Sequence, residues 1–206
     1  MKRTAVLLLA AMILGLFCVS CKRQEAPPAL GDAEAAARLA ELVPDAMRLM
    51  RVAYGEGLET ETAADAERTV GTDYRPVSKN AAYTSAAQIR ADAERLFSSD
   101  YLKGTLYVLL FDGYTPPSET QKNETVVSDH IDPRYREENG VLLADVNFSG
   151  FEIRTEPVPE SARVVSGNDR SVTVCMDYRT DGETAGTMRV RLVLENGSWL
   201  LDGPVY

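Results

Sequence analysis

The 206-residue chain is poor in the residues on which many functional sites depend, with one histidine, one tryptophan and three cysteines. A single histidine excludes zinc sites that need two, such as the HExxH helix. The sequence also lacks a Walker-type loop, a dinucleotide fingerprint and a Gly-x-Ser-x-Gly turn. Basic residues are scarce, because 22 Lys and Arg stand against 31 Asp and Glu. Nothing supplies the basic stripe that phosphate binding requires, so we expect no nucleic-acid partner.

Long hydrophobic runs are also missing, with one exception at residues 5–19, directly after Lys2 and Arg3. These 15 residues are too few for a comfortable bilayer span and are typical of a secretory signal. Ser20 and Cys21 follow the run. A small residue before Cys at this place resembles the lipobox of bacterial lipoproteins, although Cys18 stands where that family usually has Leu.

The lipobox resemblance implies that residues 1–20 are a signal peptide and that Cys21 carries the lipid. Residues 21–31 would then form the lipidated cysteine and its tether, followed by a single α+β domain over residues 32–206. The formal charge would change from −9 to −11, because Lys2 and Arg3 are lost with the signal. Two or more acyl chains hold a protein stably on a bilayer. We expect an anchor in the cell membrane or outer membrane, with the body outside the cytoplasm. The alternative is a plain secretory signal or an uncleaved N-terminal anchor.

Cysteine usage predicts no disulfide in the mature chain. Cleavage before Cys21 and acylation of its thiol leave only Cys175, although an exported location would permit disulfides. Cys175 lies in the middle of a predicted strand without a matching Cys-His motif. A packed thiol is favoured there over a nucleophile.

Hydrophobic spacing predicts helices over about residues 32–111. Asp32 is a candidate cap for the first, which contains Pro44 as a kink or as the start of a second helix. Residues 85–88 have capping-box spacing before a second helix, and residues 98–100 offer a new cap. Residues 105–111 fit either a third helix or a strand. Residues 112–123 are predicted to be a loop.

From about residue 125 to residue 206 the hydrophobic period changes to two, which predicts strands. The predicted strands cover residues 141–146, 162–166, 171–179, 187–195 and 198–201. Asn196-Gly197 is a strong hairpin signal. The inward side chains of the long strand pair are expected to be Val172, Val174, Met176, Tyr178, Met188, Val190, Leu192 and Leu194. Helices followed by an antiparallel meander define an α+β domain.

The last strand pair, with Trp199 just after the turn, resembles the end of nuclear-transport-factor-2-like and cystatin-like proteins. That resemblance implies N-terminal helices packed on a curved antiparallel sheet. A narrower resemblance is to the IseA-like inhibitors of cell-wall DL-endopeptidases. Its marks are residues 83–85, 97–101, 133–135, 138–142 and 197–199.

Few residues are candidates for chemistry. His130 lies between Asp129 and Asp132 and is a candidate general base or half of a metal site, but a surface-loop histidine is favoured. Charges of both signs on the last strands favour cross-strand ion pairs over a docking face; they are Asp177, Arg179, Arg189, Arg191 and Glu195. We expect no cofactor, no metal and no catalytic residue, and the sequence assigns no ligand-binding residue.

The leading interpretation is therefore a non-enzymatic binding or inhibitory module on the cell envelope, with an envelope protein or a cell-wall component such as a peptidase as its partner. The alternative is a small-ligand-binding protein or enzyme with a pocket in the cone of the sheet. A dry sheet face favours the first, whereas a wet pocket that contains His130 or Asp177 favours the second.

Overall fold

The computed structural model describes residues 30–62, 73–115, 119–121, 124–126 and 130–206. Helices and antiparallel sheets are both present, so the predicted α+β class is confirmed. Cys21 and the predicted signal lie outside the described residues, as does most of the tether. Within the described ranges, no helix combines the length and the apolar character needed to cross a membrane.

Helix α2 (Asp32–Tyr54) is the longest element and runs through Pro44 without a break. The predicted cap was wrong: Gly31 is the N-cap, and its N–H donates to Glu34 at 3.0 Å. Asp32 instead accepts a hydrogen bond from the backbone N–H of Val164 at 2.7 Å, which ties the start of the helix to strand β6. The buried stripe of α2 repeats every three or four residues: Ala35, Leu39, Leu42, Val43, Ala46, Met47, Leu49, Met50, Val52 and Ala53.

The larger sheet contains β6 (Glu156–Gly167), β7 (Ser171–Thr180), β8 (Glu183–Glu195) and β9 (Ser198–Leu201), all antiparallel and in this order. Most of the predicted inward side chains are buried: Val172, Val174, Met176, Val190 and Leu192. Tyr178 and Met188 are half-buried. The prediction was wrong for Leu194, which is exposed near the end of β8. Asn196 and Gly197 both have positive φ, so the predicted hairpin turn is confirmed.

Strand β9 attaches the sheet to the second helical block. Leu201 is fully buried and forms a parallel bridge with Phe97, and the N–H of Ser98 donates to the Leu201 carbonyl at 2.8 Å. Trp199 is only half-buried against the core, and its carbonyl accepts a bond from Arg38 Nε at 2.8 Å. The contact of the last strand with the helices therefore rests mainly on Leu201.

The charges on β7 and β8 do not form the expected cross-strand pairs. The strand register places Asp177 opposite Thr187 and Arg189 opposite Cys175. Arg191 pairs instead with Asp202, just beyond β9, at 3.2 Å. Glu195 accepts hydrogen bonds from the backbone N–H and the hydroxyl of Ser99.

The second helical block contains α3 (Ala86–Leu96), α4 (Ser99–Tyr101), η1 (Leu102–Leu106) and η2 (Val108–Asp112). Ser85 accepts from the N–H of Gln88, and Ser98 accepts from that of Tyr101, so both predicted caps are confirmed. The residues 105–111, which fitted either element in the sequence, are helical. The last three elements follow one another without a gap as one helical segment, which we call the 99–112 helix; η1 and η2 are π-helical.

A smaller antiparallel sheet contains β1 (Tyr74–Pro76), β5 (Val141–Asp145) and β4 (Tyr135–Glu138), in this order. The prediction that all helices precede the strands was wrong, because β1 precedes α3. Strands β2 (Glu119–Gln121) and β3 (Glu124–Val126) pair with each other, so the predicted loop over residues 112–123 was also partly wrong. Strands of three residues are too short to show a hydrophobic period.

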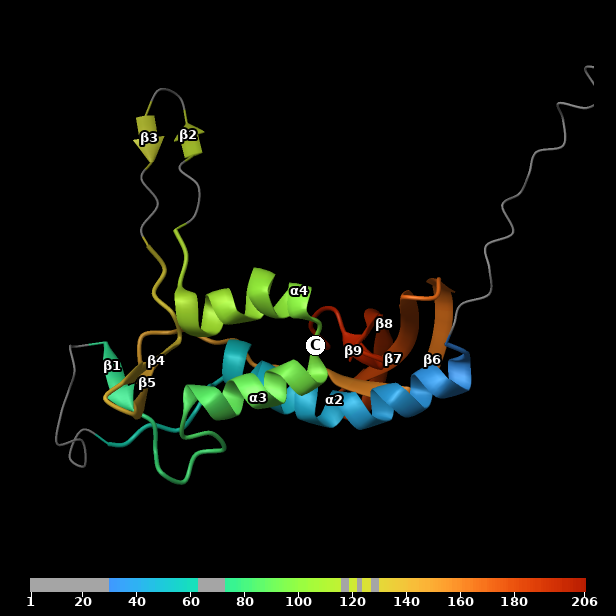
Figure 1. Ribbon diagram of the computed structural model, residues 1–206, viewed down its shortest axis with the longest axis horizontal. Helices are drawn as coiled ribbons and strands as arrows, with labels where there is room; N and C mark the ends of the chain where they lie inside the picture. The colour runs from blue at the N-terminus through green and yellow to red at the C-terminus, as the bar shows by residue number, and fades with distance from the viewer. Residues whose placement is uncertain (1–29, 63–72, 116–118, 122–123, 127–129) are drawn as a thin grey trace, which may run out of the picture.

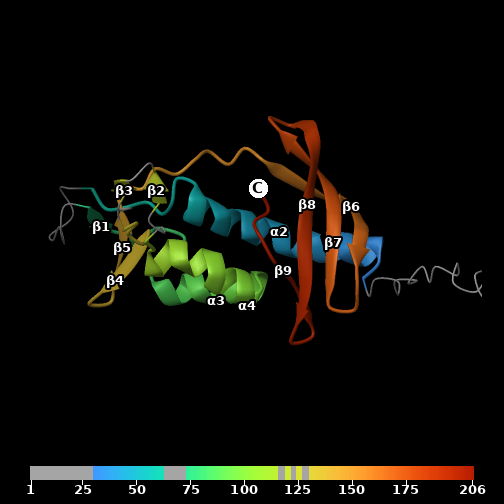
Figure 2. The ribbon, with the colours of Figure 1, turned by 90° about the horizontal axis from the view of Figure 1, so that it is seen from above.

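The two sheets lie at opposite ends of α2 (Figures 1 and 2). The larger sheet crosses the part of α2 nearer to its start, α2 packs against β6, and the smaller sheet lies near the last turn of the helix. The 99–112 helix runs toward the smaller sheet (Figure 1). The end of α2, the end of this helix and the segment that leads into β4 thus come together.

Candidate functional site

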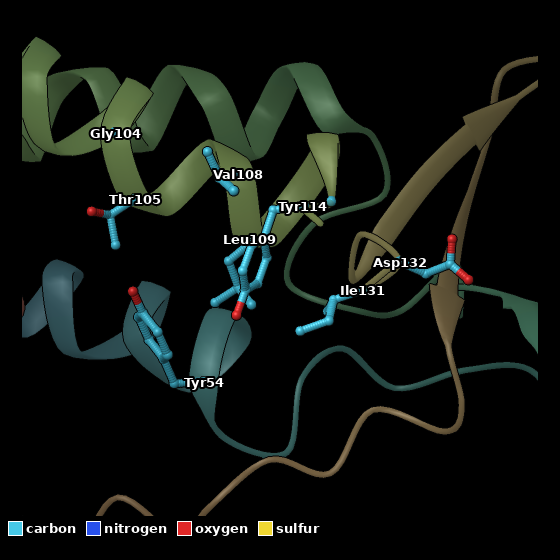
Figure 3. A pocket seen from close by; sticks show the side chains of 9 residues that line it. Tyr54, Gly104, Thr105, Val108, Leu109, Tyr114, Ile131 and Asp132 are labelled. Atoms are coloured by element: carbon cyan, nitrogen blue, oxygen red, sulfur yellow. The ribbon is translucent and has the colours of Figure 1, made fainter. Parts of the chain in front are cut away.

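An apolar groove lies where these three segments meet, and we call it the Tyr54 groove (Figure 3). Its volume is about 340 Å³. The last residue of α2 forms one wall, the 99–112 helix forms another, and two short loop segments close the end. The lining residues are Tyr54, Gly104, Thr105, Val108, Leu109, Gly113, Tyr114, Ile131 and Asp132.

The π-helical geometry shapes the wall that the 99–112 helix provides. The N–H of Tyr107 bonds to the carbonyl of Leu102, and that of Gly113 bonds to Val108 at 2.8 Å, five residues back in each case. The carbonyl of Leu109 accepts instead from the N–H of Arg134 at 3.0 Å. π-Helical turns are rare in proteins as a whole, and those that occur are often found at functional sites.

Gly104 leaves this wall open. A Cβ added at this glycine would meet no atom within 4 Å. Glycine in a helix interior costs about 1 kcal/mol relative to alanine, so packing gives no reason for it here. The open space is consistent with a groove that receives part of another molecule.

An antiparallel bridge holds the far end of the groove. Tyr114 and Ile131 exchange backbone hydrogen bonds of 3.0 and 2.8 Å. Their side chains are 47% and 42% exposed, so two large apolar groups stand in solvent at the mouth. Asp132 lies at the outer rim, and Figure 3 shows its carboxylate turned away from Tyr54. It pairs there with Arg136.

Tyr54 belongs to an aromatic cluster beside the groove. Its hydroxyl is 3.2 Å from that of Tyr101, and its ring centroid lies 5.2 Å from that of Tyr206 and 6.3 Å from that of Phe151. Burial, and then the Tyr54 hydroxyl, raise the pKa of Tyr101 far above its ordinary value. These neighbours hold the Tyr54 ring in place at the groove wall.

Arg134 fixes the last turn of α2 from below. It is 3% exposed and donates to the carbonyls of Ala53 and Gly55 at 2.8 and 2.7 Å. Its guanidinium stacks 3.9 Å from the centre of the Phe148 ring. Beside it, the Tyr135 hydroxyl donates to the Val52 carbonyl and accepts from the N–H of Leu58, both at 3.0 Å. Three carbonyls at the end of α2 are therefore satisfied by side chains from β4 and the residue before it.

The structure does not gather the candidate residues from the sequence into one site. His130 is exposed near the groove mouth, with Nδ1 3.1 Å from Thr115 Oγ1 and Nε2 4.0 Å from Asp132. Asp129 lies outside the described residues. Cys175 is half-buried on β7, on the larger sheet. Neither His130 nor Cys175 lines the groove.

Of the residues that form the groove, only Asp132 was singled out from the sequence as a candidate for chemistry, as a neighbour of His130. Tyr54 and Gly104 fit helical patterns there, and Tyr114 and Ile131 fall in segments without a clear period. The one available signal was the unresolved choice between helix and strand at residues 105–111, where an irregular helix forms.

No protein-family model matches the chain, and no curated protein is detectably similar to it.

Proposed function

We propose that the protein is a bacterial cell-envelope lipoprotein, anchored through Cys21, whose body binds a partner protein in the Tyr54 groove without catalysing a reaction. The groove is the observation that supports the binding of a partner, because it combines an apolar wall with two exposed apolar side chains at its mouth. Exposed apolar groups that cluster around a concavity are typical of interaction sites.

The packing of the larger sheet supports a binding module over a pocket in the cone of the sheet. Val172, Val174, Met176, Val190 and Leu192 are each at most 2% exposed and belong to one hydrophobic core. His130 and Asp177 do not take part in the groove lining. The fold that we propose remains nuclear-transport-factor-2-like or cystatin-like. The IseA-like marks in the sequence favour a cell-wall peptidase as the partner.

A small-molecule ligand is the second candidate function. The groove volume of about 340 Å³ falls at the lower end of the range for small-ligand pockets, roughly 300–1,000 Å³. A small molecule that fills the groove should raise the melting temperature of the chain without any partner protein.

The anchor is tested by metabolic labelling. The full chain is expressed in bacteria with a labelled fatty acid, and we expect the label on the native chain and not on Cys21→Ala. An unlabelled native chain, or equal label on the variant, contradicts the proposed anchor.

The binding function is tested with a variant that fills the groove. Gly104→Leu introduces a side chain where the helix has open space, so the fold should keep its stability while the groove loses volume. The matched control is Ala37→Leu, which adds a similar side chain at an exposed position near the start of α2.

The native chain and both variants are used to capture partners from envelope extract after chemical cross-linking. We expect one protein that is recovered with the native chain and Ala37→Leu and is lost with Gly104→Leu. Recovery that is equal for all three contradicts the groove as the site. Absence of any partner, together with a small molecule that raises the melting temperature of the native chain alone, favours the second candidate.

A further inference from the structure

The electrostatics of the Tyr54 groove bear on what it binds. Two helices end at the groove: α2 at Tyr54, and the 99–112 helix at Asp112. The C-terminal end of a helix carries about half a negative charge, which favours a nearby cation. At α2 the buried guanidinium of Arg134 supplies that cation.

The end of the 99–112 helix has the opposite arrangement. Its last residue is Asp112, an exposed carboxylate that follows Val108 of the groove wall by about one helical turn. Among the described residues Asp112 forms no salt bridge. A carboxylate at a helix C-terminus is unfavourable, and such local conflicts are expected at functional sites.

Among the described residues, the arginines and the lysine near this end have other contacts or positions. Arg90 stacks on Tyr107 and Phe111, which do not line the groove. Arg136 is already paired with Asp132 on the outer rim. Lys103 is exposed and precedes the groove wall by one residue, at the other end of the helix from Asp112. The mouth of the groove thus joins exposed apolar side chains to a negative helix end.

We propose that the occupant of the Tyr54 groove is a basic and apolar segment of a partner protein. An apolar side chain fills the space beside Gly104 and Leu109, and a neighbouring Lys or Arg meets Asp112 and the end of the 99–112 helix. The negative formal charge of the whole chain, −9, attracts such a segment as well. This inference rests on the proposed binding function and adds the chemistry of the partner.

The test uses three 12-residue probe peptides that alternate Leu with Lys, Leu with Glu, and Ser with Lys, each with one photo-cross-linking residue. The full acylated chain is placed in nanodiscs of zwitterionic lipid, so that the lipid does not attract the basic probes by net charge. Cross-linked residues are identified by mass spectrometry, and binding is measured by competition with an unlabelled copy of each peptide.

We expect the Leu-Lys peptide to cross-link to the residues of the groove and the other two to cross-link much less. Asp112→Asn should weaken its binding about two- to fivefold, as expected for one exposed ion pair. Binding should also weaken at 0.5 M salt. Asp169→Asn, at an exposed turn between β6 and β7, is the matched control and should bind as the native chain does.

Two results contradict the inference in distinguishable ways. In the first, the Leu-Glu and Leu-Lys peptides cross-link equally in the groove, and Gly104→Leu blocks both. This result keeps the groove as a binding site and refutes the basic partner. In the second, the Leu-Lys peptide cross-links outside the groove, and neither Gly104→Leu nor Asp112→Asn changes this. This result refutes the groove as the binding site of the peptide and counts against the proposed function too.

Discussion

Arg134 is a buried cation that donates hydrogen bonds to backbone carbonyls, and no carboxylate in the described part of the chain forms a salt bridge with it. Burial lowers its pKa, but a guanidinium remains protonated at any ordinary pH. The cost of burying the charge is offset by the carbonyls at the end of α2, by the partial negative charge of that helix end, and by the ring of Phe148. This residue thus completes the helix and supports the groove at the same time.

Arg134→Met should lower the free energy of unfolding by about 2–4 kcal/mol, because Ala53 and Gly55 lose their hydrogen-bond donor in a buried place. Chemical denaturation measures the change. Arg154→Met removes an exposed guanidinium that forms a salt bridge with Glu152 and should change stability by less than about 0.5 kcal/mol. Equal stability of the two variants would show that the bonds of Arg134 contribute little.

Gly57 makes room for this guanidinium. Its φ is +84°, and a Cβ there would lie 2.3 Å from Arg134 Nη2. Gly57→Ala should therefore cost more than the roughly 1–2 kcal/mol of a left-handed alanine alone. Gly140→Ala is the matched control, because Gly140 has φ +76° with no atom within 4 Å of an added Cβ. Denaturation midpoints that agree between the two variants would mean that Arg134 moves aside without cost.

Tyr74 predicts how stability changes at high pH. Burial raises its pKa to about 12 from an ordinary value near 10. The unfolded chain therefore releases this proton first, and the stabilisation present below pH 10 is lost as the pH rises through 12. We expect the free energy of unfolding to fall between these values, and to fall less steeply in Tyr74→Phe. An equal slope in both chains, measured by denaturation at a series of pH values, would assign the loss to other groups.

At the scale of elements, strand β9 and its turn join the larger sheet to the second helical block. Leu201→Ala should cost about 2–5 kcal/mol, since this side chain is fully buried and lies beside Phe97. Trp199→Ala should cost less than the roughly 3–5 kcal/mol of a fully buried tryptophan, because Trp199 is half-buried. Gly197→Val should also destabilise the chain, because Gly197 has φ +81°. Chemical denaturation measures the loss of stability in all three variants. A larger loss for Trp199→Ala than for Leu201→Ala would contradict the assignment of the main contact to Leu201.

The elements that the sequence predicted best are those whose signal is local or repeated. Ser85 and Ser98 mark helix starts by side-chain chemistry, and Asn196-Gly197 marks a turn by backbone conformation. Strand β1 could not be found in this way, because it has three residues and exists through its pairing with β5. The groove could not be found either, since Tyr54, Gly104 and Ile131 are distant in sequence and meet only in the fold.

At the scale of the molecule, α2 separates the two ends. Its 23 residues span about 34 Å at 1.5 Å per residue. The start of α2, to which the proposed tether leads, lies at the end with the larger sheet (Figure 2), and the Tyr54 groove lies at the other end of this helix. An acidic body is not drawn to anionic lipid. Under the proposed anchoring, the groove can therefore meet a partner away from the bilayer surface.

The position of Arg134 also has a consequence for the order of folding. Its guanidinium can leave water without a large penalty only when the carbonyls at the end of α2 are already in place. Those carbonyls converge only in a formed last turn, and the long helix is itself stabilised by packing against β6. The smaller sheet should accordingly form after α2 and the larger sheet, and its amides should open to hydrogen exchange first. We therefore expect the smaller sheet, whose strand β4 follows Arg134 in the chain, to assemble after the larger sheet and to open before it.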